Sequence, residues 1–228
     1  MVVTRAISKP EPAEGAGPSE MLNRAEASGT GPVDKEAADR IARSSLYFDV
    51  PANKQPILYT SNYDITFFGL EKMHPFDSTK WRRCHAFLLE GGQVRRDEVV
   101  EPQEATQEDL LVAHTPEYLA SLRTSVTVAQ ITELAFVALL PNWLVQRRLM
   151  RPFRYQTGGT VLAGKLAKER GWAINIGGGF HHCCGYQGGG FCAYADITLA
   201  VKFAMEKQKV ERVMIVDLDA HQGNGHES

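Results

Sequence analysis

The sequence predicts an α/β fold, and this prediction rests on two short apolar runs and the helical pattern between them. Residues 173–176 and residues 213–216 each have the composition of a core strand. Between them, a helix is expected from Asp196, with an apolar stripe that comprises Ile197, Ala200, Val201, Ala204 and Met205. A strand, a helix and a strand in this order form a right-handed βαβ unit, which implies a parallel sheet.

The first 45 residues differ in composition from the rest of the chain. They contain no aromatic residue and four prolines. Such a stretch buries too little apolar surface to offset the entropy lost on ordering. We therefore expect residues 1–45 to be a disordered tail, and acidic residues within it argue against a transit peptide. Residues 46–228 are expected to fold.

Local signals place several elements before the βαβ unit. Residues 56–59 predict a first strand, and Asp77 or Ser78 is expected to cap the next helix. Thr106 with Asp109 resembles a capping box, and Thr115 precedes a proline at the first position of another helix. Residues 161–168 form a further helical stretch.

Composition excludes several functional classes. The net charge of −2 provides no electrostatic basis for direct binding to nucleic acid. No apolar run is long enough to span a membrane, and no secretory signal is recognisable. Four clustered cysteines do not form a disulfide framework and favour a reducing compartment, nuclear or cytosolic.

Chemistry-bearing side chains follow both predicted strands of the unit. Asp217, Asp219 and His221 lie two residues apart, so an extended backbone would direct all three to one face. Ligands bind at the carboxyl ends of strands in open parallel sheets, and these residue types bind metals. The pair His181 and His182 supplies candidate proton carriers. The alternatives are a loop of capped carboxylates, a structural histidine pair, or a zinc cluster with the adjacent cysteines.

Three motifs in order resemble the zinc-dependent histone deacetylases, and the resemblance is closest to their class IV branch. They are residues 178–182, 189–196 and 217–225, and similarity extends from about Pro56 to Ser228. Residues 180–183 and 221–227 carry the likeness to class IV. The resemblance implies the three-layer, parallel-sheet α/β fold of the arginase and deacetylase superfamily.

The resemblance also implies a metal centre. Asp219 and His221 match two zinc ligands of the family. Asp217 matches a residue that orients His181 and helps to hold a structural potassium ion. The family's third zinc ligand and its transition-state tyrosine lie on later segments, which residues 1–228 do not include. We therefore expect the N-terminal portion of a catalytic domain, incomplete at its C-terminus.

The remaining site residues are assigned in the same way. His182 matches the general base, and His181 matches the neighbouring histidine that supports the transition state electrostatically. Asn224 occupies the position that partners His182, where many relatives have aspartate. Gly190 and Phe191 match the wall of the channel that admits acyl-lysine.

Three functions from different classes follow from these assignments. The first is a zinc-dependent lysine deacylase acting on histone tails or other acyl-lysine proteins, in the nucleus or also the cytoplasm, with corepressor or chromatin complexes as partners. The second is an inactive fragment with a binding or regulatory role. The third is an arginase-like or acetylpolyamine hydrolase. The neutral Gln222 and Asn224 argue against the two-metal site of arginase-like enzymes.

Overall fold

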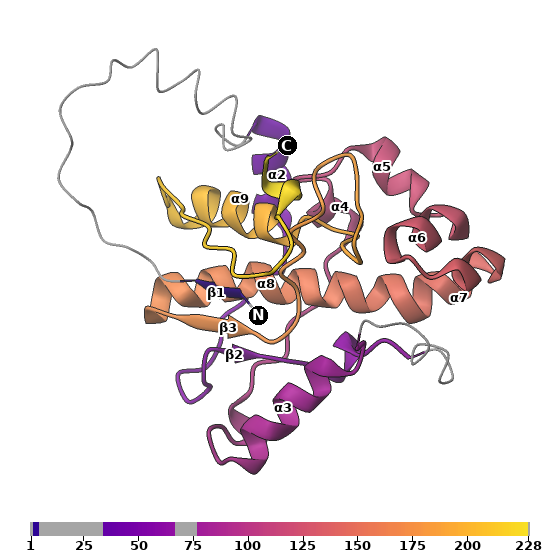
Figure 1. Ribbon diagram of the computed structural model, residues 1–228. Coiled ribbons are helices and arrows are strands. Elements are labelled where there is room, and N and C mark those ends of the chain that lie inside the picture. Colours follow the sequence, from indigo (N-terminus) through magenta and orange to yellow (C-terminus); the bar gives the residue numbers. More distant parts are fainter. Residues whose placement is uncertain (1, 5–33, 67–76, 228) are drawn as a thin grey trace.

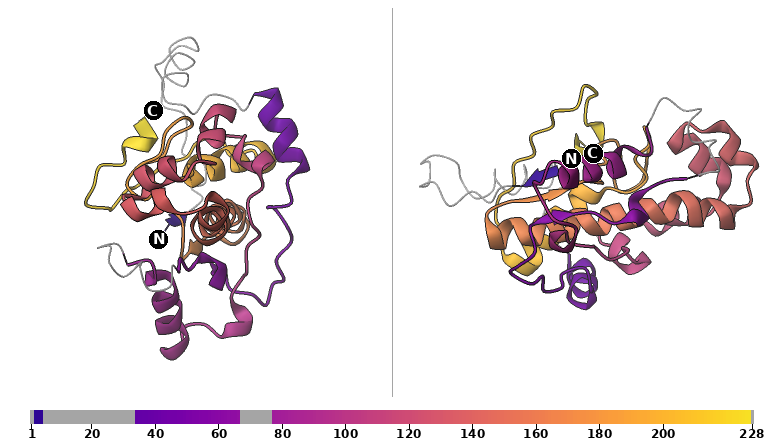
Figure 2. Two further views of the ribbon diagram at one scale, coloured as in Figure 1. Left: turned by 90° about the vertical axis from the view of Figure 1, so that its right-hand side faces the viewer. Right: turned by 90° about the horizontal axis from the view of Figure 1, so that it is seen from below.

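The computed structural model describes residues 2–4, 34–66 and 77–227. The long helix α8 (Arg151–Arg170) runs through the middle of the molecule in all views (Figures 1 and 2). It packs against the sheet through β3 (Ala173–Asn175) and also against helix α9 (Asp196–Gln208). Residues from Pro152 to Ala167 supply its buried surface, so α8 links the sheet to α9.

The sheet has the strand order β1-β3-β2 among the described residues. Strand β2 (Ile57–Leu58) pairs parallel to β3, as the sequence predicts for an α/β fold. Strand β1 (Val2–Thr4) pairs with β3 on its other edge and runs antiparallel to it. A cluster of Leu58, Leu162, Leu166 and Ala173 packs between the sheet and α8.

The second strand of the predicted βαβ unit does not form. Residues 213–216 pair with no strand, and their side chains are 44–71% exposed. The prediction of this strand was therefore wrong, and the two edges of β3 are held by β1 and β2. Helix α9 itself is confirmed. Its buried apolar side chains are Leu199, Ala200, Phe203 and Ala204, so the core-facing stripe is rotated relative to the predicted one.

The predicted disordered tail is wrong for the residues that the structure describes within it. Helix α2 (Lys35–Arg43) begins after Asp34, whose carboxylate accepts a hydrogen bond of 2.7 Å from the amide of Ala37. Ala37 and Ile41 are buried, and the charged residues around them obscured this stripe in the composition. Strand β1 also lies in the predicted tail. Residues 5–33 lie outside the described residues.

The remaining elements are short helices on either side of α8. They are α3 (Lys80–Glu90), α4 (Gln107–Leu110), α5 (Pro116–Ser121), α6 (Ser125–Thr132) and α7 (Asn142–Val145), the 3-10 helices η1 (Ser61–Tyr63), η3 (Arg96–Glu98), η4 (Ala135–Leu139) and η6 (Asn224–Glu227), and the π-helix η5 (Gln146–Met150). No helix among the described residues is long and apolar enough to cross a membrane.

Helix starts were predicted well where the cap is local. Thr106 and Asp109 form the predicted capping box of α4, and the Thr115 hydroxyl accepts from Tyr118 at the start of α5. The start of α3 differs from the prediction. Its N-cap is Thr79, which makes no side-chain cap bond, and the Thr79 hydroxyl donates to the Asp77 carboxylate at 2.6 Å.

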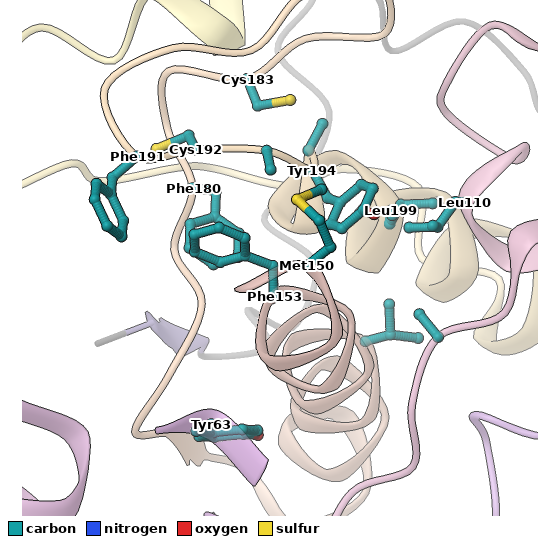
Figure 3. Packing of buried hydrophobic residues seen from close by; sticks show 14 of the residues in the cluster. Tyr63, Leu110, Met150, Phe153, Phe180, Cys183, Phe191, Cys192, Tyr194 and Leu199 are labelled. Carbon is teal, nitrogen blue, oxygen red and sulfur yellow. The ribbon is translucent and has the colours of Figure 1, made fainter. Parts of the chain in front are cut away.

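The core joins the first half of α8 to the loop between β3 and α9. Phe153 lies edge-on to Phe180 and Phe191, with ring centroids 5.3 and 5.8 Å apart (Figure 3). The buried His114 fastens this loop: its Nε2 accepts from the amide of Ala195 at 3.0 Å, and its Nδ1 lies 3.3 Å from the carbonyl oxygen of Gly185. His114 therefore has a structural role in holding this loop.

Burial lowers the pKa of His114 from 6.5 to about 4. The unfolded chain therefore binds a proton at a higher pH than the folded one, and stability contributed by neutral His114 is lost as the pH falls from 6.5 towards 4. We expect wild type to lose about 2 kcal/mol more unfolding free energy than His114→Gln between pH 7 and pH 4.5. Urea unfolding at the two values measures this difference. Equal losses in the two proteins would contradict it.

Candidate active site

The histidine pair is held in place by the glycine-rich loop that follows β3. Gly178 and Gly179 have φ angles of 73° and 79°, a left-handed conformation that glycine adopts without steric cost. The carboxylate of Asp196 accepts hydrogen bonds from the amides of Gly179 at 2.7 Å and Phe180 at 2.8 Å. It also accepts from the hydroxyl of Thr160 on α8. The residues directly before His181 are therefore tied to both large helices.

Asp196 is a site-building residue that the sequence reasoning missed. The sequence predicted that a helix begins at Asp196. The N-cap of α9 is Ala195, and the Asp196 side chain points to the loop. Complete burial raises the pKa of Asp196, and the hydrogen bonds that it accepts oppose this shift. The available signal was its position at the end of the motif at residues 189–196.

A second network of buried polar side chains holds the glycine-rich loop after β3. The Tyr63 hydroxyl donates to Asn175 Oδ1 at 2.7 Å, and Gln156 Nε2 donates to the Tyr63 carbonyl at 2.9 Å. Gln156 Oε1 then accepts from the amide of Gly178 at 3.1 Å, and Asn175 Nδ2 donates to Thr160 Oγ1 at 2.9 Å. All four side chains are buried, so the network fixes the loop where an unpaired polar group would be costly.

The two histidines have different partners and different exposure. His181 is buried, and its Nδ1 lies 2.8 Å from Asp217 Oδ2. His182 is half-buried, and its Nδ1 lies 2.7 Å from Asn224 Oδ1. The ring centroids are 4.1 Å apart. An oxygen acceptor at Nδ1 favours the tautomer with its proton there, which leaves Nε2 of a neutral ring able to accept a proton. The structure therefore brings together the four residues that the family resemblance pairs.

The segment with the two predicted zinc ligands does not continue a strand. It bends, so that Asp219 Oδ1 accepts from the His221 amide at 2.8 Å and lies 3.0 Å from His221 Nδ1. Asp217 Oδ1 accepts from the amide of Asp219 at 3.0 Å. The hydrogen bonds from these backbone amides are the largest cause that lowers the pKa values of Asp217 and Asp219, and the hydrogen bonds from the histidine rings are the second. The expectation of three side chains on one strand face is wrong for this conformation.

Carboxylate and imidazole are donors that zinc accepts, so Asp219 and His221 fit the metal chemically. His221 lies close to the histidine pair, with its ring centroid 6.0 Å from that of His182. Within the described ranges, however, no three histidine, cysteine or acidic side chains gather in a metal-binding arrangement. Asp219 and His221 would have to release each other before both could contact one ion.

The two predicted channel residues have different environments. A Cβ atom on Gly190 would lie 2.5 Å from Cδ2 of His182, so the Gly190 backbone lies against that ring. Phe191 has a φ of 65°, and its side chain is 7% exposed and packs on Phe153 (Figure 3). Gly190 therefore borders the candidate base. Phe191 contributes to the core, and its role in a channel stays a prediction.

The loop after His221 returns to the histidine pair and was not assigned a role beyond Asn224. The amide of Gly225 donates to the His181 carbonyl at 2.8 Å. A Cβ atom on Gly225 would lie 2.7 Å or less from backbone atoms of His181 and Cys183, so the two loops are in direct backbone contact. This contact positions Asn224 against His182. The glycine between Asn224 and His226 was the available signal in the sequence.

Comparison with known proteins identifies the family. The model of the histone deacetylase domain matches residues 74–228. The chain belongs to this family. Histone deacetylase 2 of Arabidopsis thaliana is 60% identical over 190 residues, which are 83% of this chain and 49% of that protein. Histone deacetylase HDAC1 of Drosophila melanogaster is 29% identical over 188 residues, covering 77% of this chain and 34% of that protein.

An uncharacterized protein of Picosynechococcus is 34% identical over 173 residues, covering 75% of this chain and 54% of that protein. The chain thus spans about half the length, or less, of these three curated relatives. Family membership confirms the α/β fold of the arginase and deacetylase superfamily that the motifs predicted.

Replacing Asp196 tests its part in building the site. We expect Asp196→Asn to lower the free energy of unfolding by about 2–4 kcal/mol, because an amide turns an NH₂ group towards buried donors. Urea unfolding at pH 7 measures the change. The matched control is Asp39→Asn, at an exposed position of α2, where a change within about 0.5 kcal/mol is expected. Equal stabilities of the two variants would refute the role of Asp196.

Proposed function

We propose that the protein containing this chain is a zinc-dependent lysine deacetylase, which hydrolyses the amide bond of acyl-lysine in histone tails or other proteins. The observation that carries the proposal is the histidine pair, in which His181 contacts Asp217 and His182 contacts Asn224. Membership of the histone deacetylase family supports it. Residues 46–228 would then be the N-terminal portion of the catalytic domain.

In this mechanism His182 is the general base. Its free Nε2 would take a proton from water and return it to the leaving lysine amine. Asn224 holds the ring through Nδ1 with the oxygen of a neutral amide. His181, held by its contact with the carboxylate of Asp217, would support the transition state electrostatically.

Asp219 and His221 would hold the zinc ion together with a third ligand. When bound, zinc lowers the pKa of water and polarises the acyl carbonyl. Asp217 would orient His181 and help to hold a structural potassium ion. Gly190 and Phe191 would border the channel for the acyl-lysine side chain.

The class IV assignment is part of the proposal and rests on the residues around His182 and His221. Nuclear function and corepressor or chromatin complexes are proposed from the same resemblance. A two-metal hydrolase is disfavoured, because Gln222 and Asn224 add no negative charge beside His221.

An inactive regulatory fragment is the second candidate, and two observations favour it for the 228-residue chain by itself. The side chains of Asp219 and His221 are hydrogen-bonded to each other. The described residues provide no third ligand beside them. Three donors are normal for a catalytic zinc site. In this case the chain would bind partners without turnover.

Turnover of an acetyl-lysine peptide with added zinc tests the proposal. We expect His182→Ala to lower kcat at least 100-fold, because the proton acceptor is lost, with the unfolding free energy changed by less than about 1 kcal/mol. The control Asp39→Asn should keep wild-type turnover. Turnover that persists in His182→Ala would refute the assignment of the base. No turnover by the 228-residue chain, with turnover by a version extended at its C-terminus, would support the fragment.

A further inference from the structure

We propose that the end of the molecule formed by α6 and α7 is a peripheral membrane-binding surface, which docks on a bilayer that contains anionic lipids. Val126, Leu139 and Trp143 form an exposed apolar patch there that would enter the bilayer interface, and arginines beside the patch would contact the lipid headgroups. Such contact needs no helix that spans the bilayer. The proposal uses none of the chemistry of the histidine pair and is independent of the proposed function.

One hydrogen bond joins the start of α6 to the turn before α7. The Ser125 hydroxyl donates to the Leu140 carbonyl at 2.8 Å. Val126 and Leu139 are the chain neighbours of these two residues, so both lie at the same end of the molecule. In Figure 1, α6 and α7 lie beyond the start of α8, at the opposite end from β3.

A second hydrogen bond places two arginines beside the patch. Gln146, directly after α7, donates from Nε2 to the Leu122 carbonyl at 2.8 Å. Arg123 and Arg147 are the next residues along the chain, and both are exposed. Trp143 lies four residues before Arg147 in the continuous helical segment of α7 and η5, so the two are on the same side of it.

The exposed fractions of the patch favour a fluid bilayer over a protein groove. Leu139 is 88% exposed, Trp143 67% and Val126 56%. Side chains that are exposed to this degree protrude from the surface, and a protein partner would need a matching pocket for each of them, whereas lipid chains adapt to any shape. Tryptophan favours the boundary between water and lipid, because its ring is apolar and its N–H group is polar.

The charge of this region is opposite in sign to that of the whole chain. Residues 123–154 contain five arginines and one glutamate, a net charge of +4, whereas the chain carries −2. The glutamate, Glu133, lies at the end of α6 away from the patch. Arg151 and Arg154 share the single carboxylate of Glu104, at 3.1 and 2.7 Å, so these three side chains retain one positive charge. Anionic headgroups complement the excess positive charge beside the patch.

Flotation of the 228-residue chain with lipid vesicles tests the proposal. We expect binding to vesicles of phosphatidylcholine mixed with phosphatidylserine, and binding weaker by about 10-fold or more to phosphatidylcholine alone or in high salt. Trp143→Ser should weaken binding to the mixed vesicles by about 10-fold. The matched control is Phe87→Ser, which removes a 65% exposed aromatic side chain from α3 and should bind as wild type does.

Two further variants test the charge and the point of contact. Arg147→Gln should weaken binding to the mixed vesicles about 5-fold, the factor that one cation contributes near an anionic surface. Arg43→Gln, at an exposed position of α2, is its control and should bind as wild type does. Mixed vesicles should shift the tryptophan emission of wild type to shorter wavelength. Trp143→Phe keeps an aromatic ring and the fold, so it should still bind but lose this shift.

Equal binding of Trp143→Ser and Phe87→Ser would overturn the proposal. So would wild type that floats with neither kind of vesicle, or equally well with both. A dimer detected by light scattering without lipid, and abolished by Trp143→Ser, would also overturn it and assign the patch to a second copy of the chain. Vesicle binding requires neither zinc nor turnover, so failure of the proposed function would leave this test unaffected.

Discussion

The site depends on one buried carboxylate, that of Asp196. It receives hydrogen bonds from the loop after β3 and from Thr160 on α8, and it stands at the first turn of α9. One side chain thus links the three elements that meet under the histidine pair. A buried carboxylate is tolerated only when donors surround it, so its partners cannot be removed one at a time without cost. The placement of His181 and His182 therefore depends on hydrogen bonds made inside the core.

Sequence reasoning succeeded where the deciding contact is local. The capping box at Thr106 and the helix that begins at Asp196 follow from neighbouring residues, and both are present. It failed where the outcome depends on distant partners. Residues 213–216 have a strand pattern, but none of the described strands pairs with them. Helix α2 was missed because two buried side chains carry its packing, too few to appear in composition.

The same division applies within the site. The contacts of His181 with Asp217 and of His182 with Asn224 lie where the family motifs place them, because backbone contact between the loops sets their spacing. The bend between Asp219 and His221 could not be predicted from alternation. An aspartate can accept a hydrogen bond from the amide two residues later, and this local bond competes with the extended strand on which the prediction rested. An unpaired segment adopts the bend, which a paired strand would suppress.

The close approach of Gly190 to His182 has a consequence for sequence variation. A Cβ atom at position 190 would lie 2.5 Å from the imidazole of His182, so any side chain there forces the ring to move. A library of all amino acids at this position would rank them by the displacement of the His182 ring that each requires. Alanine requires the smallest displacement of the ring. The left-handed backbone at Gly190 (φ 52°) adds conformational strain to every other residue type, and this strain is smallest for asparagine and aspartate. The set of amino acids that position 190 tolerates would thus report how closely the His182 ring must approach it.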